Sequence, residues 1–375
     1  MQKRYQICTR CVMDTTDPDI EFYENGVCNH CRKYYEVVKK EMIPLSDRNT
    51  ELQKIINKVK EEGKDKKYDC IMGMSGGIDS SYVAYLAYKY KLKPLAVHLD
   101  NGWDSKESQE NIKNIIGKLG FELYTYEANW EEFKDLQRSY LKSSVVDIEV
   151  LTDNALISFI NNLTLKNNIK YQLNGMNIVT ELIMPKSWNY IKTDAKNIRA
   201  IQKIFGTKKI DNISLINTIQ YQWNTVVTKK IKGINILDYV DYNKLKAKDI
   251  LKEELSWKDY GEKHYESIFT RFYQGYILPR KFGIDKRRAH LSNLICSGQI
   301  TRKEAIDKLK ENPYSSKKLL EEDKDYVLSR LGFSKDEFEK IMSEKPKSHL
   351  DYPNETATMR YVFTVGRLIK PFIKY

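Results

Sequence analysis

A glycine-rich turn between an apolar strand pattern and an apolar helix pattern is the segment best suited to bind phosphate. The strand pattern ends at Met74, the turn is Ser75-Gly76-Gly77, and the helix pattern begins near Asp79. Such a turn points several backbone N–H groups at one spot, at the positive end of the helix dipole. We expect the hydroxyls of Ser75, Ser80 and Ser81 to add donors, and Asp79 to hold Mg²⁺ against phosphate oxygens. A serine-glycine turn capped by Asp79 is the alternative.

A second candidate ligand follows the next strand pattern along the chain. Asp100 comes directly after the apolar run 95–99 and opens the sequence Asp-Asn-Gly. Open α/β sheets bind ligands at the carboxyl ends of their strands, so Asp100 is a candidate nucleotide or Mg²⁺ contact. A turn-forming Asp-Asn-Gly is the competing interpretation.

Four cysteines near the start of the chain have the spacing of a metal site. Cys8 and Cys11 form one C-x-x-C pair, Cys28 and Cys31 form another, and 16 residues separate the two pairs. This is the spacing of a Cys₄ zinc ribbon, in which four thiolates leave no open position and the zinc is structural. An iron–sulfur centre is the rival, because four thiolates can hold either. His30 is off the ligand spacing and is interpreted as a surface residue.

The elements that must position these residues alternate between short apolar runs and longer amphipathic segments. Strands are expected at 68–74, 95–99, 121–126, 171–173 and 234–237. This alternation predicts a doubly wound parallel α/β sheet. The expected organisation is a Cys₄ module at 1–45, a helical connector at 46–67, an ATP-binding α/β domain at 68–240 and a mainly helical domain at 241–375.

Composition places the chain among ordinary folded proteins. Hydrophobic residues make up 41% and charged residues 30%, and no apolar run approaches the 18 residues of a membrane helix. The first residues lack the apolar core of a signal peptide, so a cytoplasmic location is expected. The formal net charge of +12 permits an anionic partner, although a gene rich in A and T would also favour lysine codons.

Two further blocks narrow the function. The first is 175–188, and the second, 257–298, runs from Trp257-Lys-Asp-Tyr-Gly-Glu to Leu-Ile-Cys-Ser-Gly298. Ser-Gly-Gly-Ile-Asp-Ser-Ser at 75–81 resembles the SGGxDS signature of PP-loop enzymes, which cleave ATP between its α and β phosphates. Together with the cysteine pairs, the blocks resemble the N-acetyl sugar amidotransferase family of bacterial surface-polysaccharide and nonulosonic-acid biosynthesis.

The resemblance implies that a sugar acetamido group becomes an acetamidino group while ATP is converted to AMP and pyrophosphate. The carbonyl oxygen of an amide is a poor leaving group, so its adenylylation to an imidate lets ammonia displace AMP. Such chemistry needs Mg²⁺, positioning and cations rather than a covalent enzyme nucleophile. Lipopolysaccharide O-antigen and pseudaminic or legionaminic acid type glycans are the products implied.

The resemblance also assigns roles to residues of the two blocks. Glu266 and His264 are candidates for proton transfer, and Gly175, Asn177 and Glu181 for nucleotide binding. Six basic residues are candidates to hold the triphosphate, the alternative for each being a solvated surface charge: Lys263, Arg271, Lys281, Lys286, Arg287 and Arg288.

The nitrogen source and two other functions remain open. Neither Cys70, expected in the core, nor Cys296 lies in a nucleophile elbow, so ammonia is expected from a separate glutaminase with a synthase-like subunit. The main rival function is tRNA thiolation or lysidine formation, since a basic surface suits a polyanion. A non-catalytic nucleotide-binding scaffold is the third hypothesis. A nucleotide-activated N-acetyl sugar is the favoured substrate, with neither nucleic acid nor membrane as a partner.

Overall fold

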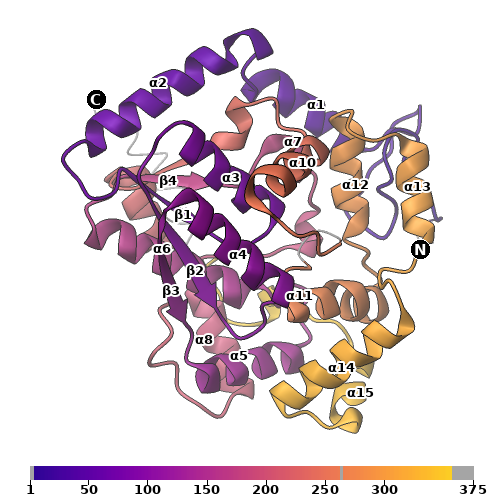
Figure 1. The fold of residues 1–375 in the computed structure, drawn as a ribbon. Coiled ribbons are helices and arrows are strands. Elements are labelled where there is room, and N and C mark those ends of the chain that lie inside the picture. The colour runs from indigo at the N-terminus through magenta and orange to yellow at the C-terminus, as the bar shows by residue number, and fades with distance from the viewer. Residues whose placement is uncertain (1–3, 262–264, 357–375) are drawn as a thin grey trace, which may run out of the picture.

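A five-stranded parallel sheet forms the centre of the molecule. The structure is a computed structural model that describes residues 4–261 and 265–356. The strands are β1 (Cys70–Gly73), β2 (Pro94–Asp100), β3 (Glu122–Glu127), β4 (Tyr171–Asn174) and β5 (Lys232–Asn235), in the order β3-β2-β1-β4-β5 (Figure 1). The chain winds outward from β1 to β3 and then crosses to β4 on the other side of β1. The switch point of this doubly wound sheet, where such folds bind ligands, therefore lies between β1 and β4.

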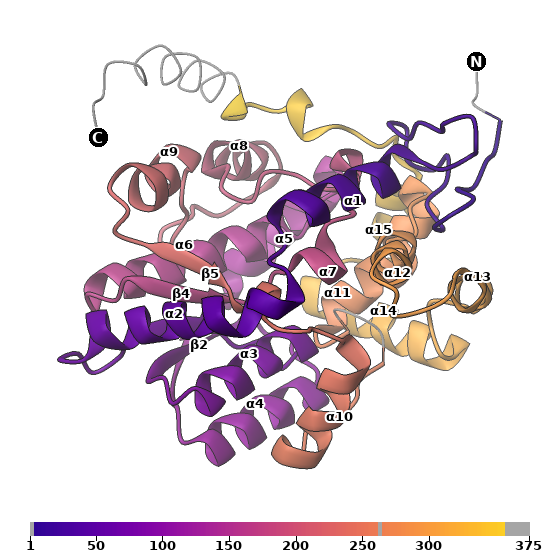
Figure 2. The same cartoon turned by 90° about the horizontal axis from the view of Figure 1, so that it is seen from above.

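Helices cover both faces of the sheet and bury its central strands, as the parallel arrangement requires, while the edge strand β3 stays largely exposed. Ile71, Leu95 and Val97 pack with Leu163 of α6 (Val150–Lys166) on one face. Alternate residues such as Met72 pack on the other face, against helices α2 (Leu45–Gly63), α3 (Ile78–Lys89), α4 (Lys106–Leu119) and α10 (Lys244–Leu255). Figure 2 shows these two helical layers on either side of the sheet. The doubly wound α/β fold predicted from the sequence is thus confirmed, and β5 begins two residues earlier than expected.

The remaining elements surround this sheet. Helix α1 (Asn29–Glu41) contains Cys31 and follows a loop segment that contains the other three N-terminal cysteines, and α5 (Trp130–Ser143) packs against α8 (Ala195–Phe205). Short helical segments α7 (Ile178–Glu181), α9 (Thr218–Gln222) and α11 (Ile268–Phe272) connect longer ones, and a π-helical segment covers Tyr273–Phe282. The C-terminal region is helical, as expected, with α12 (Arg287–Cys296), α13 (Arg302–Lys310), α14 (Lys317–Leu331) and α15 (Lys335–Ser343).

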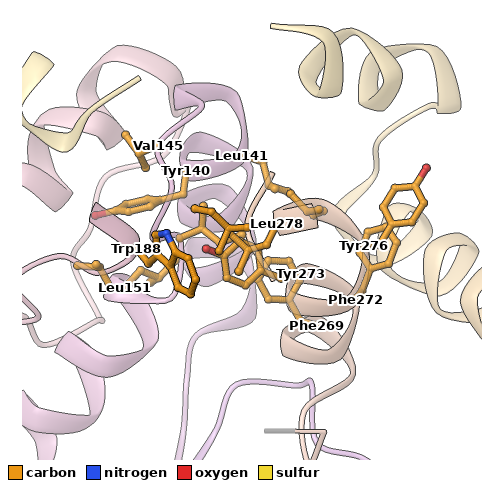
Figure 3. Close-up of a cluster of buried hydrophobic side chains, with 14 of the residues drawn as sticks. Tyr140, Leu141, Val145, Leu151, Trp188, Phe269, Phe272, Tyr273, Tyr276 and Leu278 are labelled. Atoms are coloured by element: carbon orange, nitrogen blue, oxygen red, sulfur yellow. The ribbon is translucent and has the colours of Figure 1, made fainter. Parts of the chain in front are cut away.

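One large hydrophobic core joins segments that lie far apart in the sequence. Tyr140 of α5, Trp188, and Phe269, Phe272 and Tyr273 at the start of the C-terminal region are all buried together (Figure 3). The same core includes the four N-terminal cysteines. The C-terminal helices therefore pack on the sheet domain through shared apolar contacts, and the domain boundaries inferred from sequence stay predictions.

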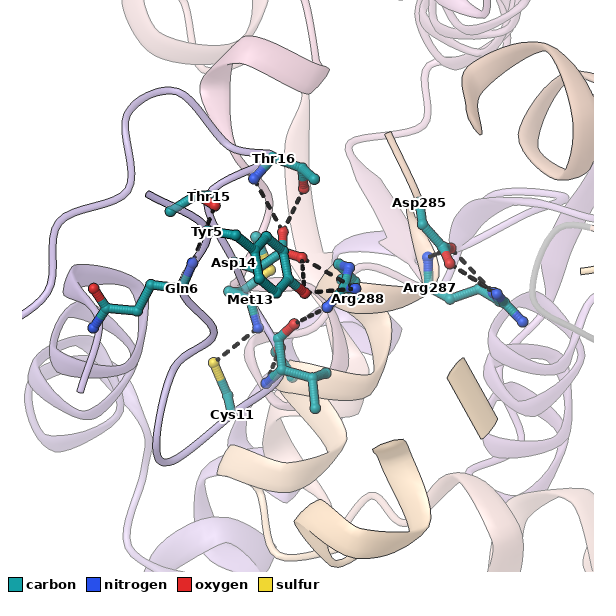
Figure 4. Close-up of polar contacts among 12 residues, drawn as sticks. Tyr5, Gln6, Cys11, Met13, Asp14, Thr15, Thr16, Asp285, Arg287 and Arg288 are labelled. Atoms are coloured by element: carbon teal, nitrogen blue, oxygen red, sulfur yellow. Dashed lines mark hydrogen bonds and ion pairs between the residues drawn. The ribbon is translucent and has the colours of Figure 1, made fainter. Parts of the chain in front are cut away.

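Polar contacts fasten the N-terminal module to α12 and α13. Arg288 of α12 pairs with the buried carboxylate of Asp14 at 3.0 Å and donates to the carbonyl of Val12 at 2.9 Å (Figure 4). Arg302 of α13 donates to the carbonyls of Cys8 and Cys11 at 2.9 and 3.0 Å. Across the described ranges, 4–261 and 265–356, none of the helices has the length and apolar character needed to cross a membrane.

Candidate active site

The phosphate loop leaves β1 and enters α3 through a backbone that only glycine adopts readily. Gly76 has a φ of +76°, and a Cβ built on it would lie 2.7 Å from the carbonyl oxygen of Ser108. Ser80 Oγ lies 3.1 Å from Ser75 Oγ and donates to the Gly77 carbonyl at 3.1 Å. The two serines predicted as phosphate donors thus lie together at the N-terminus of α3, where the helix dipole favours an anion.

Three side chains from other elements hold the loop in place. Ser108 Oγ donates to the Ser75 carbonyl at 2.8 Å. Trp257 Nε1 donates to the Gly76 carbonyl at 2.9 Å, and the fully buried Asn111 donates to the same oxygen at 3.4 Å. These bonds fix the loop carbonyls, while the N–H groups of Ser75 and Gly77 donate within the loop to Ser80 Oγ and Ser75 Oγ at 3.3 Å, contacts that a bound anion would replace. No local sequence pattern indicated that Ser108 and Asn111 of α4 hold the loop.

Asp79 lies on the first turn of α3 beside the end of β4. The Tyr242 hydroxyl donates a short hydrogen bond to its carboxylate. Burial, followed by the charge of Asp79, raises the pKa of Tyr242 well above its ordinary value, so Tyr242 stays a neutral donor. A Cβ on Gly175 would lie 3.3 Å from Asp79 Cβ, so the missing side chain lets β4 approach the loop closely. Glu181, which raises the pKa of Tyr242 through its charge, also lies in this region.

A cavity of about 310 Å³ opens beside the loop. Ser75 and Ser80 line one side, and the first residues of α6 line another with Glu149, Thr152 and Asp153. Four carboxylates border the cavity, and among its described lining residues there is no lysine or arginine: the four are Asp104, Glu149, Asp153 and Glu266. Carboxylate oxygens are the ligands that Mg²⁺ takes in proteins, so the donor set fits a magnesium nucleotide.

An antiparallel bridge brings Glu266 to the phosphate loop. Ser105 N–H donates to the Glu266 carbonyl at 2.8 Å, and Ile268 N–H donates to the Trp103 carbonyl at 2.8 Å, with Asp104 opposite Ser267. A Cβ on Gly77 would lie 3.2 Å from Glu266 Oε1. The second sequence block therefore contributes directly to the cavity, where the proton-transfer role assigned to Glu266 stays a prediction.

His98, at the carboxyl end of β2, was absent from the candidate residues. Its Nδ1 donates to the Met74 carbonyl at 2.9 Å, and its Nε2 lies 2.8 Å from Asp104 Oδ2. Burial opposes a charge on the ring, but the hydrogen bond to Asp104 and the Asp104 charge outweigh it and raise the pKa of His98 above its ordinary value. The ring of His98 therefore keeps a positive charge to a higher pH than an ordinary histidine does.

The five described cations that were assigned to the triphosphate have protein partners in the structure, and their contact with the triphosphate stays a prediction. Arg271 makes a two-pronged pair with the buried Asp323, with N–O distances of 2.7 and 2.8 Å. Lys286 lies 3.2 Å from Glu149, and Arg287 pairs with Asp285 at 2.8 Å. Lys281 donates to Ser144 and to the Ile341 carbonyl, and Arg288 holds the N-terminal module. Lys263 and His264 lie outside the described residues.

Three other residues were predicted to contact the nucleotide. In the structure, two of them form local hydrogen bonds and the third is buried away from the cavity. Asp100 Oδ1 accepts from Gly102 N–H at 2.8 Å, which is the turn-forming role considered as its alternative. Asn177 caps α7 by accepting from Thr180 N–H at 2.8 Å. Ser81 is fully buried and does not line the cavity. Nucleotide binding by these three residues stays a prediction.

The four N-terminal cysteines converge as their spacing predicts. Their Sγ atoms all lie within 4.8 Å of one another, and all four side chains are fully buried. Backbone N–H groups of Arg10, Cys11 and Cys28 lie 3.3–3.4 Å from Cys8 Sγ. Four convergent buried sulfurs, of which Cys8 and Cys11 receive backbone N–H donors, fit a tetrahedral metal ion, for which zinc is the proposed identity.

Two further residues lie near this cluster, and one of them differs from expectation. Cys296 Sγ lies 3.7 Å from Cys31 Sγ, and its side chain is 7% exposed, so it packs against the metal module. His30 was interpreted as a surface residue, yet its side chain is only 14% exposed, and Nε2 lies 2.6 Å from a fully buried Asp17 carboxylate. That interpretation was wrong, because the contact with Asp17 holds the ring of His30 away from solvent. The local sequence did not indicate this pairing, since 13 residues separate the two.

Two family models match separate parts of the chain. Residues 49–134 match NAD synthase, and residues 266–365 match the C-terminal domain of the LPS biosynthesis protein WbpG-like family. The first match, the sheet order and the loop show a PP-loop fold of the NAD synthase type, which suggests an ATP-dependent enzyme. The two matches together support an N-acetyl sugar amidotransferase-like member of this group, in lipopolysaccharide biosynthesis.

Similar curated proteins match over shorter stretches. The uncharacterized protein MJ1599 of Methanocaldococcus jannaschii is 35% identical over 116 residues, 29% of this chain and 38% of that protein. The tRNA(Ile)-lysidine synthase of Chlamydia pneumoniae is 34% identical over 82 residues, 21% of this chain and 26% of that protein. The chain thus spans less than two fifths of either relative.

Two solved structures also align with the chain. The NH3-dependent NAD synthetase of Campylobacter jejuni aligns with a TM-score of 0.30 and 17% identity, over 56% of this chain and 94% of that one. The NMN synthetase of Francisella tularensis aligns with a TM-score of 0.30 and 16% identity, over 55% of this chain and 87% of that one. At this score the fold assignment rests on the strand order and the loop.

Proposed function

We propose that the protein is an ATP-dependent amidotransferase that converts the acetamido group of a sugar into an acetamidino group. The amide oxygen attacks the α-phosphate of ATP, which releases pyrophosphate and forms an O-adenylyl imidate. Ammonia then adds to the imidate carbon, and AMP leaves with the original oxygen while the nitrogen loses a proton. The proposed product belongs to a bacterial surface glycan.

The observation that carries this proposal is the shared cavity beside the phosphate loop. Ser75 and Ser80 line this cavity, and both lie in the segment that matches NAD synthase. Glu266, Ser267 and Thr270 also line it, and they lie in the segment that matches the WbpG-like C-terminal domain. The bridge between Asp104 and Ser267 fixes the two parts against each other. A nucleotide on the loop therefore faces residues of the segment that matches the polysaccharide-biosynthesis family.

The charges around this cavity suit the proposed steps. The loop N–H groups and the serine hydroxyls would hold the pyrophosphate that leaves, where they stabilise its developing charge. Asp79 and the cavity carboxylates would hold Mg²⁺, which neutralises phosphate charge when bound. The carboxylates of Glu149 and Glu266 line the same space and are the groups placed to accept the proton that ammonia gives up.

Ammonia would come from a separate protein. Cys296, which lies in no nucleophile elbow of the sequence, is packed against Cys31 and is nearly inaccessible. That position is unsuited to a glutaminase nucleophile, which must reach glutamine. The expectation of a glutaminase partner with a synthase-like subunit is therefore part of the proposal.

Product formation by the pure chain tests the proposal. The protein is incubated with ATP, Mg²⁺, ammonium at alkaline pH and a panel of nucleotide-linked acetamido sugars, and products are analysed by mass spectrometry. We expect a product lighter than the substrate by about one mass unit, the difference between O and NH, together with AMP in equal amount. Glutamine in place of ammonium should give no product. Absence of any amidine across the panel, despite bound zinc and ATP, would contradict the proposal.

A tRNA-modifying enzyme is the second candidate. The match to a tRNA(Ile)-lysidine synthase and the net charge of +12 favour it. The two candidates differ in what stimulates pyrophosphate release. A nucleotide-linked sugar should stimulate release under the first proposal, and bulk tRNA should do so under the second. The same assay shows turnover, which a non-catalytic scaffold would lack.

A further inference from the structure

A fifth cysteine lies against the cluster of four. Cys296 is the last residue of α12, and its Sγ lies 3.7 Å from Sγ of Cys31 on α1. The Tyr35 hydroxyl, also from α1, donates to the Cys296 carbonyl at 3.2 Å. Helix α1 therefore contacts both the backbone and the side chain of Cys296. Five of the six cysteines of the chain gather in this one place, and the sixth, Cys70, lies in β1.

A tetrahedral metal ion accounts for the spacing of the four cluster sulfurs but not for the fifth. Metal–sulfur bonds of about 2.3 Å give a tetrahedron with edges of about 3.8 Å. Sγ of Cys8 lies 3.9 Å from Sγ of Cys31, and Sγ of Cys11 lies 3.7 Å from Sγ of Cys28. The four sulfurs that lie within 4.8 Å of one another do not include Cys296. Because four ligands complete a tetrahedron, Cys296 contacts a ligand sulfur without being a ligand itself.

The two sulfurs are close enough to form a disulfide, and one of them is open to solvent. From 3.7 Å they must approach by about 1.7 Å to reach a sulfur–sulfur bond of about 2.05 Å. Cys296 is 7% exposed, whereas Cys31 is fully buried. Tyr35, whose hydroxyl contacts the Cys296 carbonyl, is itself 37% exposed. The pair thus lies just beneath the surface, where an oxidant much smaller than glutamine meets Cys296 first.

We propose that Cys296 and Cys31 are an oxidative modification site, at which hydrogen peroxide converts the two sulfurs into a disulfide and thereby opens the metal site. The Cys296 sulfur attacks one peroxide oxygen, the O–O bond breaks, and the thiol proton leaves with the second oxygen as water. The Cys31 sulfur then attacks Sγ of the Cys296 sulfenic acid, the S–O bond breaks, and the departing hydroxide takes a proton from solvent. Each sulfur gives up one electron, and the peroxide takes both.

The disulfide has two structural consequences. Cys31 is no longer a thiolate, so the metal site keeps three of its four ligands and loses affinity for the ion. The new bond also joins α1 covalently to the end of α12. Neither consequence depends on the proposed reaction, because the cysteines lie apart from the residues that line the phosphate-loop cavity.

Disulfide mapping of the full chain tests the site. The protein is treated with hydrogen peroxide, alkylated without reduction, digested and analysed by mass spectrometry, while a chelating dye follows zinc release. We expect a Cys31–Cys296 disulfide that forms in step with zinc release and is reversed by dithiothreitol and added zinc. Cys296→Ser changes the side-chain volume little, and it should slow zinc release at least about fivefold because Cys31 then has no partner sulfur outside the cluster. Cys70→Ala, which removes a buried thiol from β1, is the matched control and should behave as the parent.

Two results would overturn the proposal. Equal zinc release from the parent and from Cys296→Ser would show that peroxide oxidises the four ligands without Cys296. Disulfides confined to the four ligands, or a Cys296 sulfinic acid beside a reduced Cys31, would show that the two sulfurs do not react with each other. The map is made on the parent chain, so it decides the question even where Cys296→Ser folds poorly or the preparation holds little zinc. Pyrophosphate release is not measured here, and a failure of the proposed function leaves this outcome unchanged.

Discussion

Trp257 donates a hydrogen bond from Nε1 to the carbonyl oxygen of Gly76 at 2.9 Å and so fixes the phosphate loop from a point 181 residues further along the chain. The indole is buried, and it packs against Tyr260 with ring centroids 5.4 Å apart. The loop depends on this bond because a rotated Gly76 peptide would turn its carbonyl toward the phosphate.

Trp257→Phe keeps most of the apolar volume and removes the donor. We expect kcat/KM for ATP in pyrophosphate release to fall about tenfold, the effect of one hydrogen bond of about 1–1.5 kcal/mol. Trp223→Phe serves as the control because Trp223 is 57% exposed. Equal activity of the two variants would show that the bond does not position the loop.

Gly76→Ala places a methyl group 2.7 Å from the Ser108 carbonyl, at a φ that alanine avoids. We expect loss of nucleotide binding with an unfolding free energy lower by about 1–3 kcal/mol. Gly117→Ala is the matched substitution, since Gly117 lies in α4 with open space around its Cβ position. That variant should be as stable as the parent or more so by about 0.5–1 kcal/mol. Nucleotide affinity and urea denaturation check both.

Asp79→Ala should abolish ATP cleavage and leave the fold intact, because the carboxylate lies on the first turn of α3, directly after the phosphate loop, and its proposed task is to hold Mg²⁺. Tyr242→Phe removes only the hydroxyl that hydrogen-bonds to Asp79. That control should retain turnover at a reduced rate. Pyrophosphate release and thermal unfolding are measured together, and normal release from a stable Asp79→Ala protein would refute the assignment.

Metal analysis of the pure protein should give one zinc per chain, since four buried sulfurs lie within 4.8 Å of one another. Cys28→Ser should lose the metal and much of the stability. Cys296→Ala should keep the metal, because Cys296 is adjacent to the cluster and is not one of its four convergent sulfurs. Less than half an equivalent of zinc, or the absorbance of an iron–sulfur cluster, would contradict zinc.

Stability should depend on pH through His349. This ring is stacked on Tyr190 at 4.0 Å, and burial lowers its pKa to about 4 from an ordinary value of 6.5. Between these values the unfolded chain binds a proton that the folded chain does not. The unfolding free energy should therefore fall by about 3 kcal/mol as the pH decreases from 6.5 to 4. Urea titrations at several pH values measure this slope, and His349→Phe should flatten it in proportion.

The sheet and the loop were predictable because their signals are local. Buried parallel strands appear as short apolar runs, and the Ser-Gly-Gly turn occupies residues that follow one another. The four cysteines were also predictable, since paired thiolates at fixed spacing have few other uses in such a chain.

The rest of the site depends on pairings across long stretches of sequence. Glu149 and Asp153 join the cavity because α6 starts at its edge, and no pattern around them indicates it. Lys286 was expected on the nucleotide but pairs with Glu149, 137 residues away. The residue type of Lys286 alone suggested a contact with phosphate. The fold instead gives this lysine a carboxylate partner, which no local sequence pattern indicates.

Helix α12 runs from the wall of the phosphate-loop cavity to the metal module. Lys286, which directly precedes the helix, lies 3.2 Å from Glu149 of that cavity, and Cys296 at its far end lies 3.7 Å from Cys31 Sγ. Ser292, between them, accepts the Val12 N–H at 3.2 Å. The cysteine module therefore supports the cavity wall from outside the site of the chemistry. A preparation short of zinc should lose this support and part of its activity, and specific activities compare fairly only between samples of equal metal content.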